Sequence, residues 1–272
     1  MTLRQAQGHP EQRRGVTEAD GAPLAGRAVL VTGGSSGIGR AIAVAAARAG
    51  ADVALTYRAN EKGAREVERE IVSMRRRAVV IRLNLSDADS LRALGPAARD
   101  GLGRLDVWIN NAGADILTSA GASLTPAERL DLLMTVDLRG TILASWQAAE
   151  ILAGQPDGGV IINMSWDHVL TGMPGTNPQL FAAVKGGVMA FSKSLARSVA
   201  PRVRVNILAP GWIETSFGSS VDERVYREVA ESTPLRRWGT PDDVAAAAVF
   251  LASPAAAFLT GETIQVSGGV VM

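Results

Sequence analysis

The chain contains no cysteine, and its 272 residues include only two histidines, His9 and His168. The lack of cysteine excludes disulfides, thiolate nucleophiles and thiolate metal sites. Two histidines are too few for a histidine-rich metal site, so we predict that the protein binds no metal.

An excess of charge and a long apolar run are also missing. The 28 Lys and Arg residues balance 27 Asp and Glu residues, so no overall field attracts nucleic acid or a membrane surface. No apolar run approaches the roughly 20 residues that cross a bilayer. Residues 1–23 lack the apolar core of a signal peptide and are predicted to form a flexible tail. We therefore expect a cytoplasmic protein that acts on a small molecule.

Glycines are plentiful, and three of them follow the first apolar stretch. Ala28 to Val31 is predicted to be a buried strand; Gly33, Gly37 and Gly39 come next, and an alanine-rich helical run covers 41–49. Glycine lets the backbone turn sharply and lets a pyrophosphate approach, and the start of a helix holds the anion. Strand, glycine loop and helix in this order predict nucleotide binding.

The remaining sequence alternates predicted strands and helices. Strands are expected at 52–57, 78–83, 105–109, 160–164, 202–208 and 263–266, and helices at 60–77, 87–100, from Thr125-Pro126 onward, at 179–200 and at 241–252. This alternation predicts a single doubly wound α/β Rossmann domain over residues 24–272. Its seven-stranded, mainly parallel sheet carries helices on both faces and binds ligands at the carboxyl ends of the strands.

Five short motifs make the sequence resemble one enzyme family. They are Thr32-Gly33-x-x-x-Gly37-x-Gly39, Asn110-Asn-Ala-Gly113, Asn206-x-x-x-Pro210-Gly211-x-x-x-Thr215, Thr260-Gly261 and Ser267-Gly268-Gly269. From about residue 24 onward the chain resembles the short-chain dehydrogenase/reductase family, especially 3-oxoacyl-carrier-protein reductases and glucose dehydrogenases. The resemblance implies a nicotinamide dinucleotide cofactor. It also implies a homotetramer, or a homodimer, built from the two long helices and the C-terminal strand.

The resemblance further implies which residues hold the cofactor. These are Gly33, Ser35, Ser36, Gly37, Ile38, Gly39, Arg58, Asn84, Leu85, Asn111, Ala112, Gly113, Lys185, Pro210, Gly211, Ile213 and Thr215. Asn84 stands where the family has an aspartate that contacts the adenine amino group, and its amide oxygen can still accept that bond.

Cofactor preference is predicted from the end of the second strand. An NAD-selective site has a carboxylate there, which binds the ribose hydroxyls and repels a 2′-phosphate. This chain has Tyr57-Arg58 instead. Arg58, together with Arg40 and Ser35, suits a phosphate because guanidinium offers a fork of donors. We therefore predict NADP(H) over NAD(H); the alternative is that Arg58 is a solvated loop charge.

The expected redox site departs from the family pattern. The family uses a tyrosine as proton donor, a lysine four residues later, a serine at a strand end and an asparagine on a long helix. Lys185 is present, but Phe181 replaces the tyrosine and Asp137 the asparagine. The motifs align Trp166 with the serine, whereas counting back from Phe181 without a gap aligns His168 with it.

These replacements should cripple the ordinary family mechanism, because a phenyl ring has no proton to give and acid–base catalysis supplies about 10²- to 10⁴-fold. Lys185 can still hold the nicotinamide ribose, and Asp137 either pairs with it or bonds backbone or water. Asp167 and His168 are candidate acid–base groups, although a loop histidine can be merely solvated. Ser165 should point to the opposite face and is no direct replacement.

A substrate pocket is expected around three aromatic residues. Trp166, Phe181 and Trp212 can stack on a flat substrate or fill the pocket wall. Residues 213–237, with their small hinge-like residues, are predicted to form a substrate lid.

Three functions follow from these features. The leading one is an atypical NADP(H)-binding oxidoreductase acting on an unknown carbonyl or alcohol substrate, with His168 or a water supplying protons. The second is a non-redox enzyme, such as a cyclase, isomerase or dehydratase, that uses Asp167, His168 or Asp137. The third is a catalytically silent, cofactor-binding regulatory or scaffold subunit.

Overall fold

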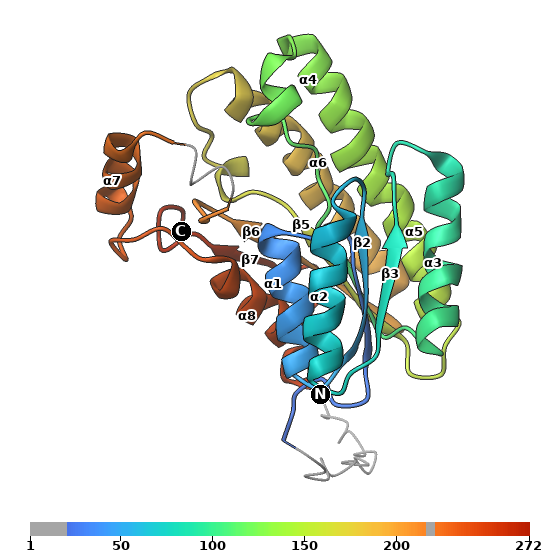
Figure 1. Ribbon diagram of the computed structural model, residues 1–272. Helices are drawn as coiled ribbons and strands as arrows, with labels where there is room; N and C mark the ends of the chain where they lie inside the picture. The colour runs from blue at the N-terminus through green and yellow to red at the C-terminus, as the bar shows by residue number, and fades with distance from the viewer. Residues whose placement is uncertain (1–20, 216–220) are drawn as a thin grey trace, which may run out of the picture.

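A computed structural model describes residues 21–215 and 221–272, so nearly all of the predicted tail lies outside the described residues. These residues form one seven-stranded sheet in the order β3-β2-β1-β4-β5-β6-β7, and every neighbouring pair is parallel (Figure 1). The doubly wound fold is therefore confirmed. The strands are β1 Ala28–Val31, β2 Asp52–Tyr57, β3 Ala78–Arg82, β4 Val107–Asn110, β5 Gly159–Met164, β6 Val203–Pro210 and β7 Thr263–Val266.

Helices cover both faces of the sheet. One face carries α1 (Gly37–Arg48), α2 (Glu61–Ser73) and α8 (Pro241–Ala252). The other carries α3 (Ala88–Leu102), α5 (Gly140–Ala153) and α6 (Thr176–Val199). Among the described residues, no helix is long and apolar enough to cross a membrane.

The remaining helices lie at the carboxyl end of the sheet or beside it. Figure 1 shows α7 (Glu223–Ser232) standing apart from the sheet. The others are α4 Pro126–Leu133, the 3-10 turns η1 Ser119–Ser123, η3 Asp167–Val169 and η5 Pro254–Ala256, and the π-helical turn η2 Met134–Arg139.

Local chemistry explains where several of these helices begin. The Asp87 side chain accepts hydrogen bonds from two backbone N–H groups of α3, as predicted for a helix cap. Thr125 and Glu128 form a reciprocal capping box at the start of α4, with Pro126 in the first turn. The helix predicted from Thr125-Pro126 is interrupted, because the π-helical η2 separates α4 from α5.

The predicted helix over 60–77 is too long. It ends at Ser73, and Arg75 adopts a left-handed backbone with φ of 60°. Asp52 explains the early end, since its carboxylate accepts bonds from Arg77 N at 2.8 Å and Arg77 Nε at 2.7 Å. These bonds draw the chain toward β2 just before β3 begins.

A buried polar network crosses the centre of the molecule. The Asn110 amide on β4 donates to Asn163 Oδ1 on β5 at 2.8 Å and to Ser145 Oγ on α5 at 3.0 Å. The Asn163 amide donates in turn to Ser192 Oγ on α6 at 2.8 Å, and Trp108 Nε1 donates to Asn110 Oδ1. Because these buried groups have partners, the network avoids the usual cost of burying amides.

A second capping box starts α8 and involves an arginine. Thr240 N donates to Asp243 Oδ2 at 2.7 Å, and both Arg237 Nη atoms bond the same carboxylate at 2.6 and 2.9 Å. The Arg237 hydrogen bonds hold the pKa of Asp243 well below its usual range.

Asp243→Asn should therefore lower the free energy of unfolding by about 1–2 kcal/mol at pH 7, from the cap and a partly exposed ion pair. Because the folded pKa of Asp243 is depressed, this stabilisation is present above the unfolded pKa of about 4 and is lost as the pH falls below it. Urea unfolding at pH 7 and pH 3 measures both effects. The exposed Asp242→Asn change is the control, and an equal loss in both variants would contradict a specific role for Asp243.

Candidate active site

A first cavity of about 660 Å³ lies at the carboxyl ends of β1 to β4. Most of the predicted cofactor residues line it, namely Gly33, Ser35, Ser36, Ile38, Gly39, Arg58, Asn84, Leu85, Asn111, Ala112, Gly113 and Thr215. Lys185, Pro210, Gly211 and Ile213 instead line a second cavity, described below. Gly37 lines neither cavity and has a φ of 54° at the start of α1.

The glycine loop is shaped to receive an anion. Gly33 has a left-handed φ of 68°, and a Cβ on Gly39 would lie 2.1 Å from the Gly33 carbonyl oxygen. Ser36 makes no side-chain cap bond, and the first turn of α1 contains no acidic residue. The N–H groups at this helix start therefore remain available, and the cradle fits a pyrophosphate.

Hydrogen bonds lock the loops that follow β1, β2 and β4 together. Thr32 Oγ1 accepts from the backbone N–H groups of Asn111 and Ala112, both at 3.0 Å. Gly33 N donates to Thr56 Oγ1 on β2 at 3.0 Å. The Asn110-Asn-Ala-Gly113 motif thus fixes the floor of the cavity.

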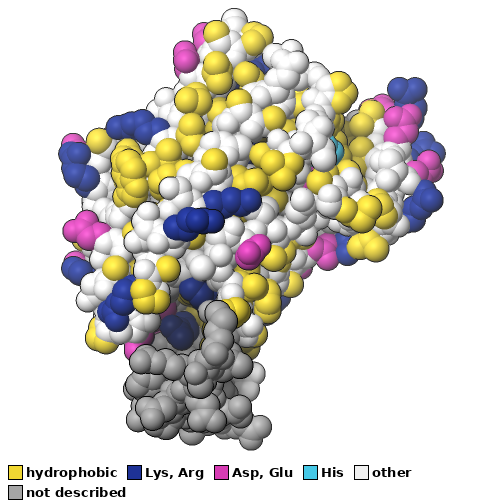
Figure 2. Space-filling view, turned by 180° about the vertical axis from the view of Figure 1, so that it is seen from behind, with side chains coloured by type: hydrophobic (Ala, Val, Ile, Leu, Met, Phe, Trp, Pro, Cys, Tyr) yellow, Lys and Arg dark blue, Asp and Glu magenta, His cyan; other side chains and the backbone are white. Residues whose placement is uncertain are grey.

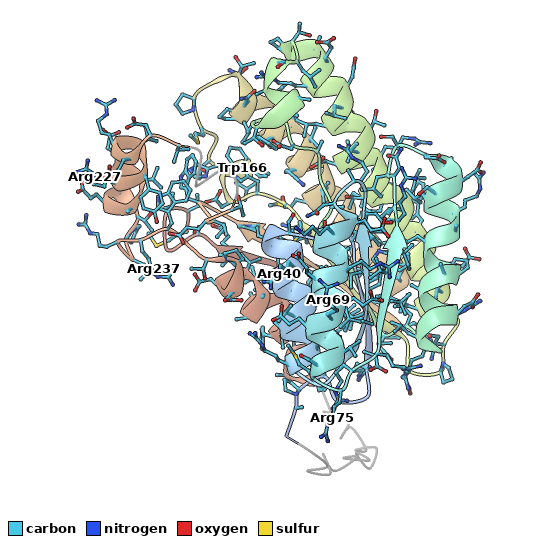
Figure 3. The ribbon with its side chains drawn as sticks, viewed as in Figure 1. Arg40, Arg69, Arg75, Trp166, Arg227 and Arg237 are labelled. Carbon is cyan, nitrogen blue, oxygen red and sulfur yellow. The ribbon has the colours of Figure 1, made fainter. Side chains whose placement is uncertain are left out.

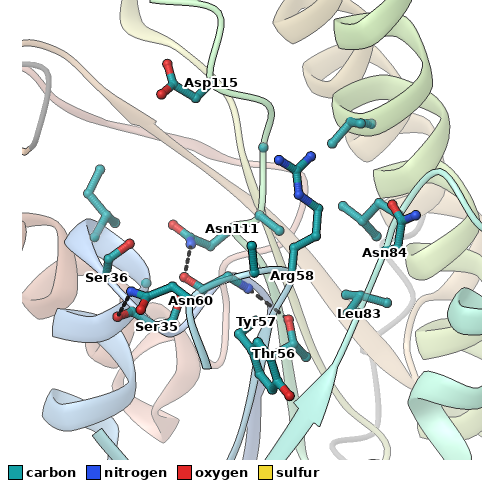
Figure 4. A pocket seen from close by; sticks show the side chains of 18 of the residues that line it. Ser35, Ser36, Thr56, Tyr57, Arg58, Asn60, Leu83, Asn84, Asn111 and Asp115 are labelled. Carbon is teal, nitrogen blue, oxygen red and sulfur yellow. Dashed lines mark hydrogen bonds between the residues drawn. The ribbon is translucent and has the colours of Figure 1, made fainter. Parts of the chain in front are cut away.

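Arg58 follows β2 directly and extends among the cavity residues. Figure 4 shows it with Ser35 and Asn60 on one side and Leu83 and Asn84 on the other. No described carboxylate forms an ion pair with Arg58.

The other residues predicted at this end of the cavity are partly engaged elsewhere. Arg40 on α1, labelled in Figure 3, pairs with Glu70 on α2 at 2.7 Å and does not line the cavity. The Asn84 amide oxygen accepts one bond from Ser86 N at 3.1 Å and retains a second lone pair.

The second cavity, of about 790 Å³, adjoins the first, because both are lined by Ile38, Asn111, Gly113, Asp115 and Thr215. Its remaining wall includes four aromatic residues, Trp166, Phe181, Trp212 and Trp238. The Trp166 and Phe181 rings are 6.1 Å apart, and the Trp212 and Trp238 rings 5.4 Å. The three predicted substrate-pocket residues therefore lie together, and Figure 3 places Trp166 at the edge of the sheet nearest α7.

Lys185 lies in this second cavity and pairs with Asp137. Asp137 Oδ2 is 2.8 Å from Lys185 Nζ, and Asp137 Oδ1 accepts from Ala114 N at 2.7 Å. Both alternatives for Asp137, the lysine pair and the backbone bond, thus occur together. Phe181 precedes Lys185 by one turn of α6 and presents a ring without a hydroxyl.

Asp167 and His168 form a hydrogen-bonded pair in the 3-10 turn that follows Trp166. Asp167 Oδ1 lies 2.7 Å from His168 Nδ1 and accepts from His168 N, while Asp167 Oδ2 is buried and has no hydrogen-bond partner among the described residues. Burial raises the pKa of Asp167, and the His168 hydrogen bond opposes that rise. Asp167 lines the cavity, whereas His168 does not and stacks on Trp166. The Ser165 hydroxyl donates to the Lys185 carbonyl.

Several lining residues were absent from the predictions, among them Asp115 and Trp238. Asp115 stands between the two cavities, and its position two residues after the Asn110-Asn-Ala-Gly113 motif was a usable signal. Trp238 reaches the cavity because Ile213 pairs with Gly239 and Trp238 stacks on Tyr226 of α7. No local pattern indicates that contact.

The role of residues 213–237 as a substrate lid stays a prediction. Their described part includes Ile213, Thr215 and α7, and α7 contains no buried residue.

Comparisons with known proteins agree with this geometry. A family model described as enoyl-(acyl carrier protein) reductase matches residues 33–271. The chain belongs to the short-chain dehydrogenase/reductase family. This is a family of oxidoreductases, as the motifs predicted.

Three similar proteins illustrate the family. A 3β-hydroxysteroid dehydrogenase of Eggerthella lenta is 34% identical over 219 residues, which cover 79% of this chain and 82% of that protein. A Burkholderia cenocepacia short-chain dehydrogenase in complex with NADP is 32% identical, with a TM-score of 0.82 over 91% of this chain and 99% of that one. A 7α-hydroxysteroid dehydrogenase complexed with NADH and 7-oxo glycochenodeoxycholic acid is 29% identical, with a TM-score of 0.83 over 92% and 96%.

Gly39→Ala tests whether the glycine loop packs as closely as the structure shows. In an ordinary helix interior this change stabilises by up to about 1 kcal/mol. Here the added methyl group would meet a backbone oxygen, so we expect a net loss of about 1–3 kcal/mol in the free energy of unfolding, measured by urea denaturation. Gly21→Ala, where nothing lies within 4 Å of an added Cβ, is the control. A stabilised Gly39→Ala variant would show that the loop does not pack this closely.

Proposed function

We propose that the protein is an atypical short-chain dehydrogenase/reductase that binds NADP(H) and transfers a hydride. Its site lacks the tyrosine that donates the proton in the family. The observation that carries the proposal is that two adjoining cavities share five lining residues, one with an anion cradle and the other with Lys185 beside Asp137. A bound nicotinamide dinucleotide would supply the hydride. The cradle would hold its pyrophosphate and Lys185 its nicotinamide ribose.

The preference for NADP(H) rests on Arg58 rather than on the relatives. One similar structure carries NADP and another NADH, so membership of the family supports a nicotinamide cofactor without choosing between the two. Arg58 is a cation without a carboxylate partner among the described residues, at the place where an NAD-selective site has an acid.

The proton chemistry of the site would differ from that of the family. Phe181 offers no acidic group, and His168 reaches the cavity only through Asp167. A proton required by the reaction would therefore come from water. Turnover without cofactor oxidation would instead favour a cyclase, isomerase or dehydratase that uses Asp167 or Asp137.

Titration with NADPH and NADH, followed by cofactor fluorescence, tests the cofactor proposal. The wild-type protein should bind NADPH more tightly. Arg58→Glu should weaken NADPH binding at least about tenfold, because a carboxylate repels the 2′-phosphate, and should leave NADH binding within about threefold. The control is Arg69→Glu on the exposed side of α2. Binding of neither cofactor would refute the oxidoreductase proposal and favour a scaffold role.

We also propose that the chain forms a homotetramer or a homodimer in the cytoplasm, with α5 and α6 at the interface. Figure 2 shows groups of hydrophobic side chains on the face of the molecule seen from behind. On α5, the side chain of Trp146 is 55% exposed, and its ring packs edge to face on Phe191 of α6. An exposed tryptophan that packs on a half-buried aromatic residue of the next helix is typical of an association surface.

Trp146→Lys should therefore shift the protein to a smaller species in sedimentation velocity. Val72→Lys on α2 is the matched control, because Val72 is also 55% exposed but lies on the opposite layer of helices. A monomeric wild-type protein, or equal behaviour of the two variants, would reject this interface.

A further inference from the structure

The second cavity, which would hold the substrate, is lined by more acidic than basic side chains. Lys185 is the one cationic side chain among the described residues that line it, and Asp137 neutralises it at 2.8 Å. Two more carboxylates, Asp115 and Asp167, line the same space. Counted over these four side chains, the lining of the cavity is net negative and favours a cationic ligand over an anionic one.

Asp167 has an unused acceptor. Its side chain is 0% exposed, and its Oδ1 is taken by His168. Its Oδ2 has no partner among the described residues and lies close to Gly211, where an added Cβ would come within 2.6 Å of it. A buried carboxylate oxygen without a partner is costly, and a cationic ligand in the cavity would relieve that cost.

The aromatic wall favours the same kind of ligand. Trp166, Phe181 and Trp238 line the cavity from three different parts of the chain. Aromatic faces attract a cation, and more strongly when it is desolvated. Aromatic rings also stack on planar groups, so the wall suits a flat cation.

The replacement of the family's tyrosine by Phe181 points to the same kind of substrate. Reduction of a ketone adds a hydride to carbon and needs a proton on oxygen, which Phe181 cannot give. An iminium ion needs no proton: its carbon takes the hydride, and the π electron pair of the C=N bond becomes the lone pair of the amine. The products are a neutral amine and the oxidised dinucleotide, so charge and electrons balance.

We propose that the substrate is a planar iminium cation, with Asp167 as its counterion and the tryptophans as its walls. The proposal rests on the oxidoreductase function proposed above and names its substrate class. Asp167 is a specificity-determining residue in this scheme.

The test compares a permanently charged bicyclic iminium, N-methyl-3,4-dihydroisoquinolinium, with 1-tetralone, a neutral ketone built on the same bicyclic frame. Each is titrated against cofactor-free and NADP⁺-saturated protein, with tryptophan fluorescence as the readout. The iminium should bind at least about tenfold more tightly than the ketone. Asp167→Asn should abolish this difference and leave NADPH binding within about twofold. Asp131→Asn, on the exposed side of α4, is the matched control.

Turnover with C4-deuterated NADPH provides a second readout. Deuterium should appear at C1 of the tetrahydroisoquinoline product, and at least about 100-fold more slowly in tetralol, given the contribution expected of a missing acid.

Equal binding of the two probes, no effect of Asp167→Asn, or deuterium found only in the alcohol would overturn the iminium proposal. If Asp167→Asn weakened NADPH instead of the iminium, Asp167 would belong to the cofactor site, and the proposal would fall as well. Failure of NADPH to bind would refute the oxidoreductase function separately. The titrations of cofactor-free protein would still decide whether the cavity selects the cation.

Discussion

The two bonds of the Asp137 carboxylate hold the site together. One oxygen binds Ala114 N beyond β4, and the other binds Lys185 on α6. Asp137 reaches both because it lies in the π-helical turn between α4 and α5, and such turns often occur at functional sites. Without this carboxylate, a lysine whose side chain is only 12% exposed would lose its ion-pair partner. The position of Lys185 in the second cavity depends on this bond.

The three residues that replace the family's polar groups around Lys185 all line the second cavity. A family member with tyrosine, serine and asparagine at these places carries neutral polar groups around the reacting carbon. Here Phe181 and Trp166 are aromatic, and Asp137 brings a negative charge that cancels that of Lys185. The chain keeps the glycine loop and the lysine, which we propose hold the cofactor, and differs at three of the four groups that we propose act on the substrate. One further replacement, Asn84, lines the first cavity.

The sequence predicted the parts of the fold that local chemistry decides. The strand before Gly33 and the helix starts at Asp87 and at Thr125-Pro126 each follow from a few adjacent residues, and all are present. Features that depend on distant partners were missed. The pairing of Arg40 with Glu70 and the place of Trp238 require contacts between separate elements. The end of α2 at Ser73 likewise depends on Asp52 of the neighbouring strand.

The buried amide network between β4 and β5 has a consequence for how the sheet assembles. Side chains alternate between the two faces of a strand, so a slip of one residue in either strand would turn that strand's asparagine, Asn110 or Asn163, to the opposite layer of helices. The two amides would no longer meet, and a buried amide would remain without its partners. The network thus penalises mispaired chains during folding. The register between β4 and β5 therefore also fixes where the loops that bear Asn111 and Trp166 leave the sheet.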